Sequence, residues 1–145
     1  MLSVIKSHDF GVSADTIWGF FGDFGSIESW WPQDGPVKID YVDVIGEGPG
    51  MLRNIYNVGM PDCISERLEA IDVENRKLTV SIVGTLPAGL TSYQANAHLE
   101  ALDKDRCRLT YVGSFEAEPG REGEAEEFLI TVYTLMFSGL DSAAS

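Results

Sequence analysis

The chain has 145 residues, 44% of them hydrophobic and 23% charged, which is typical of one soluble globular domain covering residues 1–145. Its formal net charge of −13 argues against nucleic-acid binding, which needs a basic face, and against docking on anionic membranes. No apolar run approaches the roughly 20 residues of a membrane span, no signal-peptide pattern opens the chain, and the two cysteines are scattered, so we expect a cytoplasmic protein.

The first third of the chain predicts one strand followed by two short helices. Residues 3–12 are expected to form the strand, and Ser13 is then the N-cap of a helix that ends near Gly22. A second, shorter helix is expected over residues 26–31, because Pro32 ends it.

Six strands are expected in the middle of the chain, at residues 37–44, 51–58, 63–72, 77–83, 92–102 and 106–117. The links at 73–76 and 103–105 are short enough for hairpins, so the sheet should be antiparallel. Two longer loops, 59–62 and 84–90, both contain Gly and Pro, and we expect them to flank one pocket mouth.

A long amphipathic helix is expected from about Arg121 towards the C-terminus. Its inner face is an apolar stripe at helical spacing, formed by Ala125, Phe128, Leu129, Val132, Leu135, Met136 and Gly139. Ile130 and Phe137 fall opposite that stripe, and they are either a surface for weak self-association into a homodimer or a scattered exposed pair. Together the elements predict an α+β fold in which a seven-stranded antiparallel sheet wraps around the C-terminal helix.

Strand alternation indicates which side chains face the helix. Across the 103–105 turn, Ala97 lies opposite Tyr111 and Ala95 opposite Gly113, which places small residues in the middle of the inner face. Small residues facing a helix indicate either close helix packing or open space. We favour the open space, and therefore expect an internal cavity there.

The strands at 51–58 and 63–72 add polar groups to this inner face. Arg53 and Asn57 share the inward phase of Ile55, and Glu66 shares that of Leu68. Pairing around the 59–62 loop predicts Glu66 opposite Ile55 and diagonal to Arg53 and Asn57. A buried charge needs a partner, so Arg53 and Glu66 form either the polar part of a pocket or a structural ion pair at the open end of the sheet.

Three other polar residues are candidates for the site. His8 shares its strand phase with Phe10, but Lys6 has the same phase, which favours a surface or core histidine over a catalytic one. Tyr93 and Tyr111 either offer hydroxyl groups to a ligand or are core aromatics with hydrated tips. The two histidines and two cysteines show no metal-ligand spacing, so we expect no metal and no other cofactor.

A set of short sequence pieces occurs in one order along nearly the whole chain: Ser13-Ala14-Asp15-Thr16-Ile17-Trp18, Asp23-Phe24, Trp30-Trp31-Pro32, Glu66-Arg67-Leu68, Asp72, Tyr93, Leu109-Thr110-Tyr111 and Pro119. This ordered set resembles the START-like superfamily, also called SRPBCC. The resemblance implies a helix-grip fold, with two short helices after the first strand. The superfamily contains both enzymes and carriers, so the fold alone does not define the function.

Two branches of that superfamily are similar to this chain. Residues 59–62 resemble the gate loop of the plant abscisic acid receptors, and the resemblance gives Glu66 the role of a pocket carboxylate that orders water around the ligand. The receptors' latch His-Arg-Leu is replaced by Leu86-Pro87-Ala88-Gly89-Leu90, and their pocket lysine falls near Trp31. The polyketide cyclase/dehydratase-like branch fits better, and it implies an aromatic, polyketide or lipid-like ligand.

Three functions follow as hypotheses: a carrier of a hydrophobic small molecule, a cofactor-independent cyclase, dehydratase or lyase, and a ligand-gated protein-interaction module. The catalytic candidates are Glu66, Tyr111, Arg53 and His8, since acid/base and oxyanion chemistry need such groups. The expected ligand-binding residues are Arg53, Ile55, Asn57, Met60, Pro61, Glu66, Leu68, Val80, Ile82, Leu86, Tyr93, Ala95, Tyr111, Phe115, Phe128, Val132 and Met136.

Overall fold

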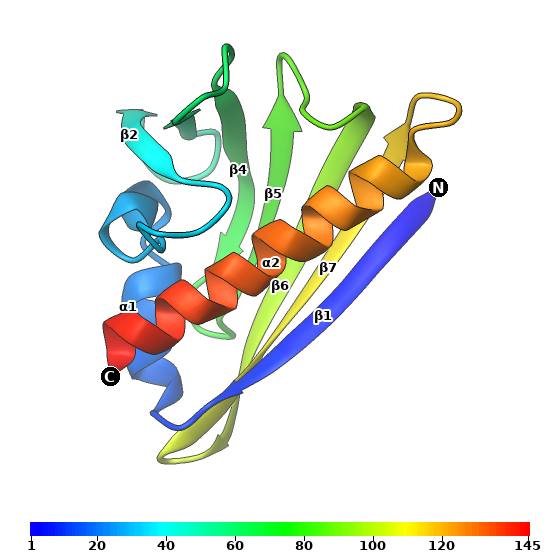
Figure 1. Cartoon of the computed structure of the whole chain (residues 1–145). Helices are drawn as coiled ribbons and strands as arrows, with labels where there is room; N and C mark the ends of the chain where they lie inside the picture. Colours follow the sequence, from blue (N-terminus) through cyan, green and yellow to red (C-terminus); the bar gives the residue numbers. More distant parts are fainter.

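The computed structural model describes residues 1–145 and contains one sheet, two α-helices and one 3₁₀-helix (Figure 1). Every element expected from the sequence is present. In chain order the elements are β1 (Leu2–Phe10), α1 (Ala14–Phe21), η1 (Phe24–Ser29), β2 (Ile39–Ile45), β3 (Leu52–Asn57), β4 (Ile64–Asp72), β5 (Lys77–Val83), β6 (Leu90–Asp103), β7 (Arg106–Ala117) and α2 (Glu122–Ala144).

The seven strands form an antiparallel sheet in the order β1-β7-β6-β5-β4-β3-β2, so β1 and β2 are its edges. Helix α2 crosses one face of the sheet diagonally, and α1 lies beside its C-terminal end (Figure 1). This is the expected α+β helix-grip arrangement. None of the helices combines the length with the apolar character that crossing a membrane requires.

The second helix and the start of β2 differ from expectation. The second helix is 3₁₀ and ends at Ser29, and β2 begins at Ile39 instead of residue 37. Between them, residues 32–38 have no regular structure. Pro32 and Pro36 explain this gap, because proline has no backbone N–H to donate to a helix or a strand ladder.

The β3–β4 hairpin has a different register from the expected one. Arg53 pairs directly with Glu66, and Ile55 pairs with Ile64, so the expected pairing of Glu66 with Ile55 is wrong. The turn is centred earlier than predicted, and Gly59 adopts φ +81° in it, a conformation that glycine accepts without strain. Because the pairing shifts by two residues, the side chains of both strands still face the expected side.

The small residues at the centre of the inner face are covered by helix α2. Ala95 and Gly113 are paired as expected, and Ala95 is 0% exposed. The hydroxyl group of Tyr133 lies so close to Gly113 that a Cβ atom there would overlap it, and the same hydroxyl is hydrogen-bonded to that of Tyr93. The expectation of open space at Ala95 and Gly113 is therefore wrong, and close helix packing is the correct interpretation.

The C-terminal half of α2 is covered on two sides. Phe137 is only 7% exposed, and its ring stacks on His8 of β1 with the ring centroids 5.4 Å apart. On another side, Gly139 allows α2 to approach the backbone of Trp30 closely. Ile130 is half-buried against the core. The expected exposure of Phe137 is therefore wrong, because β1 covers a face that one apolar stripe would leave open, whereas the half-buried Ile130 leaves weak self-association a prediction.

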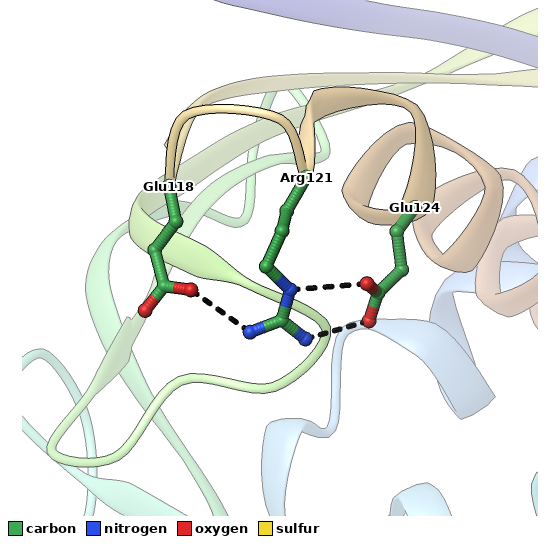
Figure 2. A network of polar contacts seen from close by, with 3 residues as sticks. All are labelled: Glu118, Arg121 and Glu124. Atoms are coloured by element: carbon green, nitrogen blue, oxygen red, sulfur yellow. Dashed lines mark hydrogen bonds and ion pairs between the residues drawn. The ribbon is translucent and has the colours of Figure 1, made fainter.

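Arg121 fixes the start of α2 (Figure 2). Its guanidinium group donates hydrogen bonds to Glu118 at 2.9 Å and to the two carboxylate oxygens of Glu124 at 3.0 and 2.7 Å. Gly89 lies against the Arg121 side chain, and its backbone oxygen accepts a hydrogen bond from the Glu118 N–H at 2.9 Å. These contacts attach the 84–90 loop to the helix N-terminus, where the carboxylate of Glu124 also suits the helix dipole.

The Tyr133–Gly113 contact predicts a coupled pair of substitutions. Gly113→Ala should destabilise the protein by about 1–3 kcal/mol, because the added methyl group overlaps the Tyr133 hydroxyl. In a Tyr133→Phe background the loss should be smaller, since the hydroxyl is gone. Chemical denaturation of the single and double variants measures this coupling.

Gly123→Ala is the matched control, because Gly123 is an exposed residue of α2 where a Cβ would meet nothing within 4 Å. It should raise the free energy of unfolding by about 0.5–1 kcal/mol. An equal loss for Gly113→Ala in both backgrounds would contradict the view that Tyr133 limits this contact.

Candidate functional site

A partly enclosed cavity lies between α2 and the side of the sheet that ends in β3 and β2. Its volume, taken as the space that the centre of a water molecule can occupy, is about 60 Å³. One water molecule needs roughly 10–15 Å³ of such space. The cavity as it stands therefore has room for a few waters or for a small organic group.

Ten of the expected ligand-binding residues line this cavity, namely Arg53, Ile55, Asn57, Glu66, Ile82, Tyr93, Tyr111, Phe128, Val132 and Met136. Seven others do not line it, namely Met60, Pro61, Leu68, Val80, Leu86, Ala95 and Phe115. Leu68, Val80, Ala95 and Phe115 do face inward, but each is at most 2% exposed, in the part of the core that is solidly packed. Strand phase alone does not distinguish a cavity wall from a filled core.

The loops 59–62 and 84–90 lie at the same end of the sheet, as expected, because the first residues of β4 pair with the last residues of β5 (Figure 1). Neither loop contributes a side chain to the cavity wall. Met60 and Leu86 pack half-buried against the core, and Pro61 is exposed. The expectation that these three residues line the cavity is wrong, because the loops extend beyond its end.

We infer that the cavity opens between residues 37–39 and helix α2, because its half-buried apolar wall residues lie there. The half-buried residues of its wall include Val37 and Ile39 on one side and Phe128 and Val132 on the other. Next to this opening Gly35 lies against the Leu135 side chain, and a Cβ atom on Gly35 would be 2.6 Å from its Cδ2. That contact holds the irregular segment 32–38 against α2.

Sequence reasoning misses seven wall residues, namely Ile27, Trp31, Val37, Ile39, Ile64, Leu129 and Tyr133. Ile27 lies in η1, and Trp31 and Val37 lie between η1 and β2, where no periodicity assigns a face. Tyr133 had a usable signal, since it follows Leu129 by four residues and therefore lies on the same helix face.

Arg53 and Glu66 form a nearly buried ion pair in the cavity wall. Arg53 Nε donates a hydrogen bond to Glu66 Oε1 at 2.7 Å, and the two side chains are 7% and 15% exposed. Arg53 Nη1 also donates to the backbone oxygen of Phe24 at 3.0 Å, and the guanidinium carbon lies 3.9 Å from the centroid of that ring. These contacts attach β3 to η1. Each ion neutralises the other, so the pair brings no net charge to the cavity.

Three tyrosines meet in the cavity wall, Tyr93 from β6, Tyr111 from β7 and Tyr133 from α2. Tyr93 and Tyr133 are hydrogen-bonded through their hydroxyl groups, and the ring of Tyr111 packs edge-on against that of Tyr133 with centroids 4.7 Å apart. Burial raises the pKa of Tyr93 and of Tyr111 well above the usual 10.0, and it raises the pKa of Tyr133 in the same direction. All three hydroxyls are therefore neutral near pH 7, where they serve as hydrogen-bond donors and are weak proton acceptors.

Of the polar candidates, Asn57 lines the cavity and His8 does not. Asn57 is 6% exposed and lines the cavity, and neither its amide nitrogen nor its amide oxygen has a hydrogen-bond partner. His8 faces α2, but its Nε2 lies 2.7 Å from Asp141 at the far end of the helix, outside the cavity. His8 therefore lies apart from the cavity, as the favoured interpretation of a surface or core histidine implies, whereas Glu66, Arg53 and Tyr111 do share the cavity wall.

Known proteins share both sequence features and fold with this chain. A family model described as polyketide cyclase / dehydrase and lipid transport matches residues 1–144. No curated protein matches the sequence.

The fold is shared with several solved structures. One is a protein from Bacillus thuringiensis, with a TM-score of 0.83 and 22% identity over 99% of this chain and 98% of that chain. XoxI from Bacillus cereus has a TM-score of 0.83 and 23% identity over 99% and 95% of the two chains. Norcoclaurine synthase from Thalictrum flavum, in complex with dopamine and hydroxybenzaldehyde, has a TM-score of 0.76 and 21% identity over 98% and 85%.

The three buried phenols predict that the protein loses stability at alkaline pH. Their folded pKa values are raised, so the folded state keeps protons that the unfolded chain releases near its ordinary pKa of about 10. The stabilisation is complete below about pH 10 and is lost as the pH rises further. Tyrosinate absorbance and far-UV circular dichroism, recorded together, should show these phenols ionising in step with unfolding.

Tyr111→Phe should make the alkaline loss of stability less steep, because one of the protons that distinguish the two states is removed. Ionisation of all five tyrosines with an unchanged circular dichroism spectrum would contradict the prediction.

Proposed function

Because the chain belongs to the polyketide cyclase / dehydrase and lipid transport family, we propose that it binds a small, mostly apolar molecule in the cavity beneath α2. The observation that carries the proposal is the composition of the wall. Three of its 17 residues are polar, namely Arg53, Asn57 and Glu66, and the other 14 are hydrophobic. An apolar wall with a few polar groups is the usual form of a small-molecule site.

Aromatic or polyketide-like rings suit this wall best. Five of its residues are aromatic, namely Trp31, Tyr93, Tyr111, Phe128 and Tyr133. Flat rings pack against such side chains in offset or edge-to-face arrangements, which add to the gain from apolar burial. The Thalictrum flavum protein of the same fold is one that holds two aromatic molecules.

The volume of the cavity limits what enters without movement. The cavity volume of about 60 Å³ is too small for a molecule of several rings. A larger ligand needs the irregular segment 32–38 to move away from α2, which requires separating Gly35 from Leu135. The mouth next to Val37 and Phe128 is the place where such an opening extends the cavity.

Native mass spectrometry of freshly purified protein tests the proposal. We expect part of the protein to carry an extra mass of about 100–500 daltons, as drug-sized and smaller ligands have. Val132→Trp should abolish this extra mass, because the larger ring fills the mouth. Thr134→Trp is the control, since it adds the same side chain at an exposed position of the same helix. Absence of any bound mass, together with no saturable binding of neutral N-phenyl-1-naphthylamine, would contradict the proposal.

A cofactor-independent cyclase, dehydratase or lyase is the second candidate. Its support is the presence of Glu66 and the hydrogen-bonded pair Tyr93 and Tyr133 in one wall. In such a reaction the hydroxyls stabilise an oxyanion and the carboxylate moves a proton. One observation favours binding instead: Arg53 already occupies the carboxylate of Glu66, the group that would have to move the proton.

A ligand-gated interaction module has less support. Such a module needs an exposed apolar surface at the loops that close over the ligand. Met60 and Leu86 in loops 59–62 and 84–90 are instead half-buried against the core. The resemblance of these loops to a gate and a latch is therefore not accompanied by a free apolar surface.

Glu66→Gln separates binding from catalysis. For a binding protein we expect the ligand affinity to fall by about 1–3 kcal/mol, because the amide replaces a charged acceptor of the buried network. For a general base, affinity should persist and turnover should slow by roughly 10²–10⁴-fold. Calorimetry and ligand titration distinguish the two outcomes, and we expect the first.

A third pattern would remove the ion pair from the site. If Glu66→Gln and Arg53→Met both lower the melting temperature and neither changes ligand affinity, the pair is structural. Glu69→Gln is the control, since it makes the same chemical change on the outer face of β4, next to Arg67 and Ser81. It should leave both affinity and turnover unchanged.

A further inference from the structure

The amide of Asn57 is the polar group of the cavity whose hydrogen bonds are not satisfied within the protein. The residue is 6% exposed, and neither its nitrogen nor its oxygen has a partner. Buried polar groups are hydrogen-bonded in the great majority of cases, because an unpartnered group has lost its hydration without compensation. A buried unpartnered amide in a cavity wall therefore indicates a molecule that completes it.

The surroundings of Asn57 supply no such partner. Its neighbours in the wall include Ile55 on the same strand and Ile39, with which it pairs on β2. Ile64 and Val37 are also apolar. An asparagine amide presents an acceptor and a donor side by side. The complementary group therefore has a donor next to an acceptor, as a carboxamide, a lactam or a hydroxy-carbonyl group does.

The charges around the cavity indicate that this molecule is neutral. Arg53 and Glu66 are already paired at 2.7 Å, so neither charge is left for a ligand ion. The three tyrosines are neutral near pH 7, and the chain as a whole has a formal net charge of −13. A carboxylate ligand would be an uncompensated anion in an apolar cavity of an acidic protein, which is strongly unfavourable.

We propose that Asn57 selects neutral ligands in which an aromatic or aliphatic body carries a carbonyl group next to an N–H or O–H group. The paired donor and acceptor of the ligand meet the Asn57 amide, and the body lies over Ile55 towards the tyrosines. The inference rests on the proposed function, because it assigns the ligand class of the same cavity.

Four probes with one common shape test the ligand class in the wild-type protein: benzamide, acetophenone, benzoate and isopropylbenzene. Only benzamide is neutral and has a donor next to an acceptor. Protein-detected NMR titration measures weak affinities and locates the site. We expect benzamide to bind about tenfold or more tighter than acetophenone and isopropylbenzene, since acetophenone leaves one hydrogen bond of the buried amide unmade and isopropylbenzene leaves both unmade. Benzoate should bind most weakly.

Asn57→Leu tests the residue itself, because leucine has nearly the same shape and no polar group. We expect this variant to have a higher melting temperature than the wild type and to bind isopropylbenzene at least as tightly as benzamide. Asn54→Leu is the matched control on the same strand, at a position that faces away from the cavity. It should keep the wild-type order of affinities.

The outcomes distinguish this inference from the proposed function. If isopropylbenzene binds in the cavity as tightly as benzamide, the inference is wrong and the cavity remains an apolar binding site. A lower melting temperature for Asn57→Leu with an unchanged order of affinities would also overturn it, because the amide would then be structural. If none of the probes binds and no ligand co-purifies, both the inference and the proposed function fail. The order of the four probe affinities in the wild-type protein tests the inference even if a variant does not fold.

Discussion

The contact of Tyr133 with Gly113 and Tyr93 determines how helix α2 lies over the sheet. Because Gly113 has no side chain, the phenol ring reaches the sheet backbone, and its hydroxyl is satisfied by that of Tyr93. The helix is therefore packed closely over β7 and the adjoining β1, and the Tyr93 hydroxyl reaches it from β6. Antiparallel sheets twist, so a straight helix that touches one side diverges from the other. The cavity lies on that diverging side, below β3 and β4.

The charged and amide side chains of the interior are concentrated beside the cavity. Arg53, Asn57 and Glu66 lie on β3 and β4, whereas the inward residues of β6 and β7 are apolar or small, apart from the tyrosine hydroxyls. A buried ion pair adds little net stability compared with apolar residues of the same volume, and an unpartnered amide lowers stability. Such residues are expected where recognition, and not packing alone, has shaped the sequence.

Local sequence signals predict the strands of this fold well, but they predict the placement of α2 less well. Alternation assigns the faces of β3 to β7 correctly, and the short 103–105 turn defines the β6–β7 register, because a tight turn leaves little freedom. The 59–62 loop is longer, and the register that follows it is shifted. The predicted exposure of Phe137 is wrong, because β1, which is far away in the sequence, covers this side chain. Irregular segments such as 32–38 have no periodicity, so their wall residues are visible only in three dimensions.

Helix α2 is fastened at both ends, by Arg121 with its two glutamates at the start and by the close approach of Gly139 to Trp30 near the end. With α2 held at both ends, the segment 32–38 is the neighbouring part of the chain without regular structure, and Gly35 places it against Leu135 of α2. For the proposed binding function we therefore expect exchange of a ligand to depend on how segment 32–38 separates from Leu135, whereas affinity depends on the residues of the cavity wall.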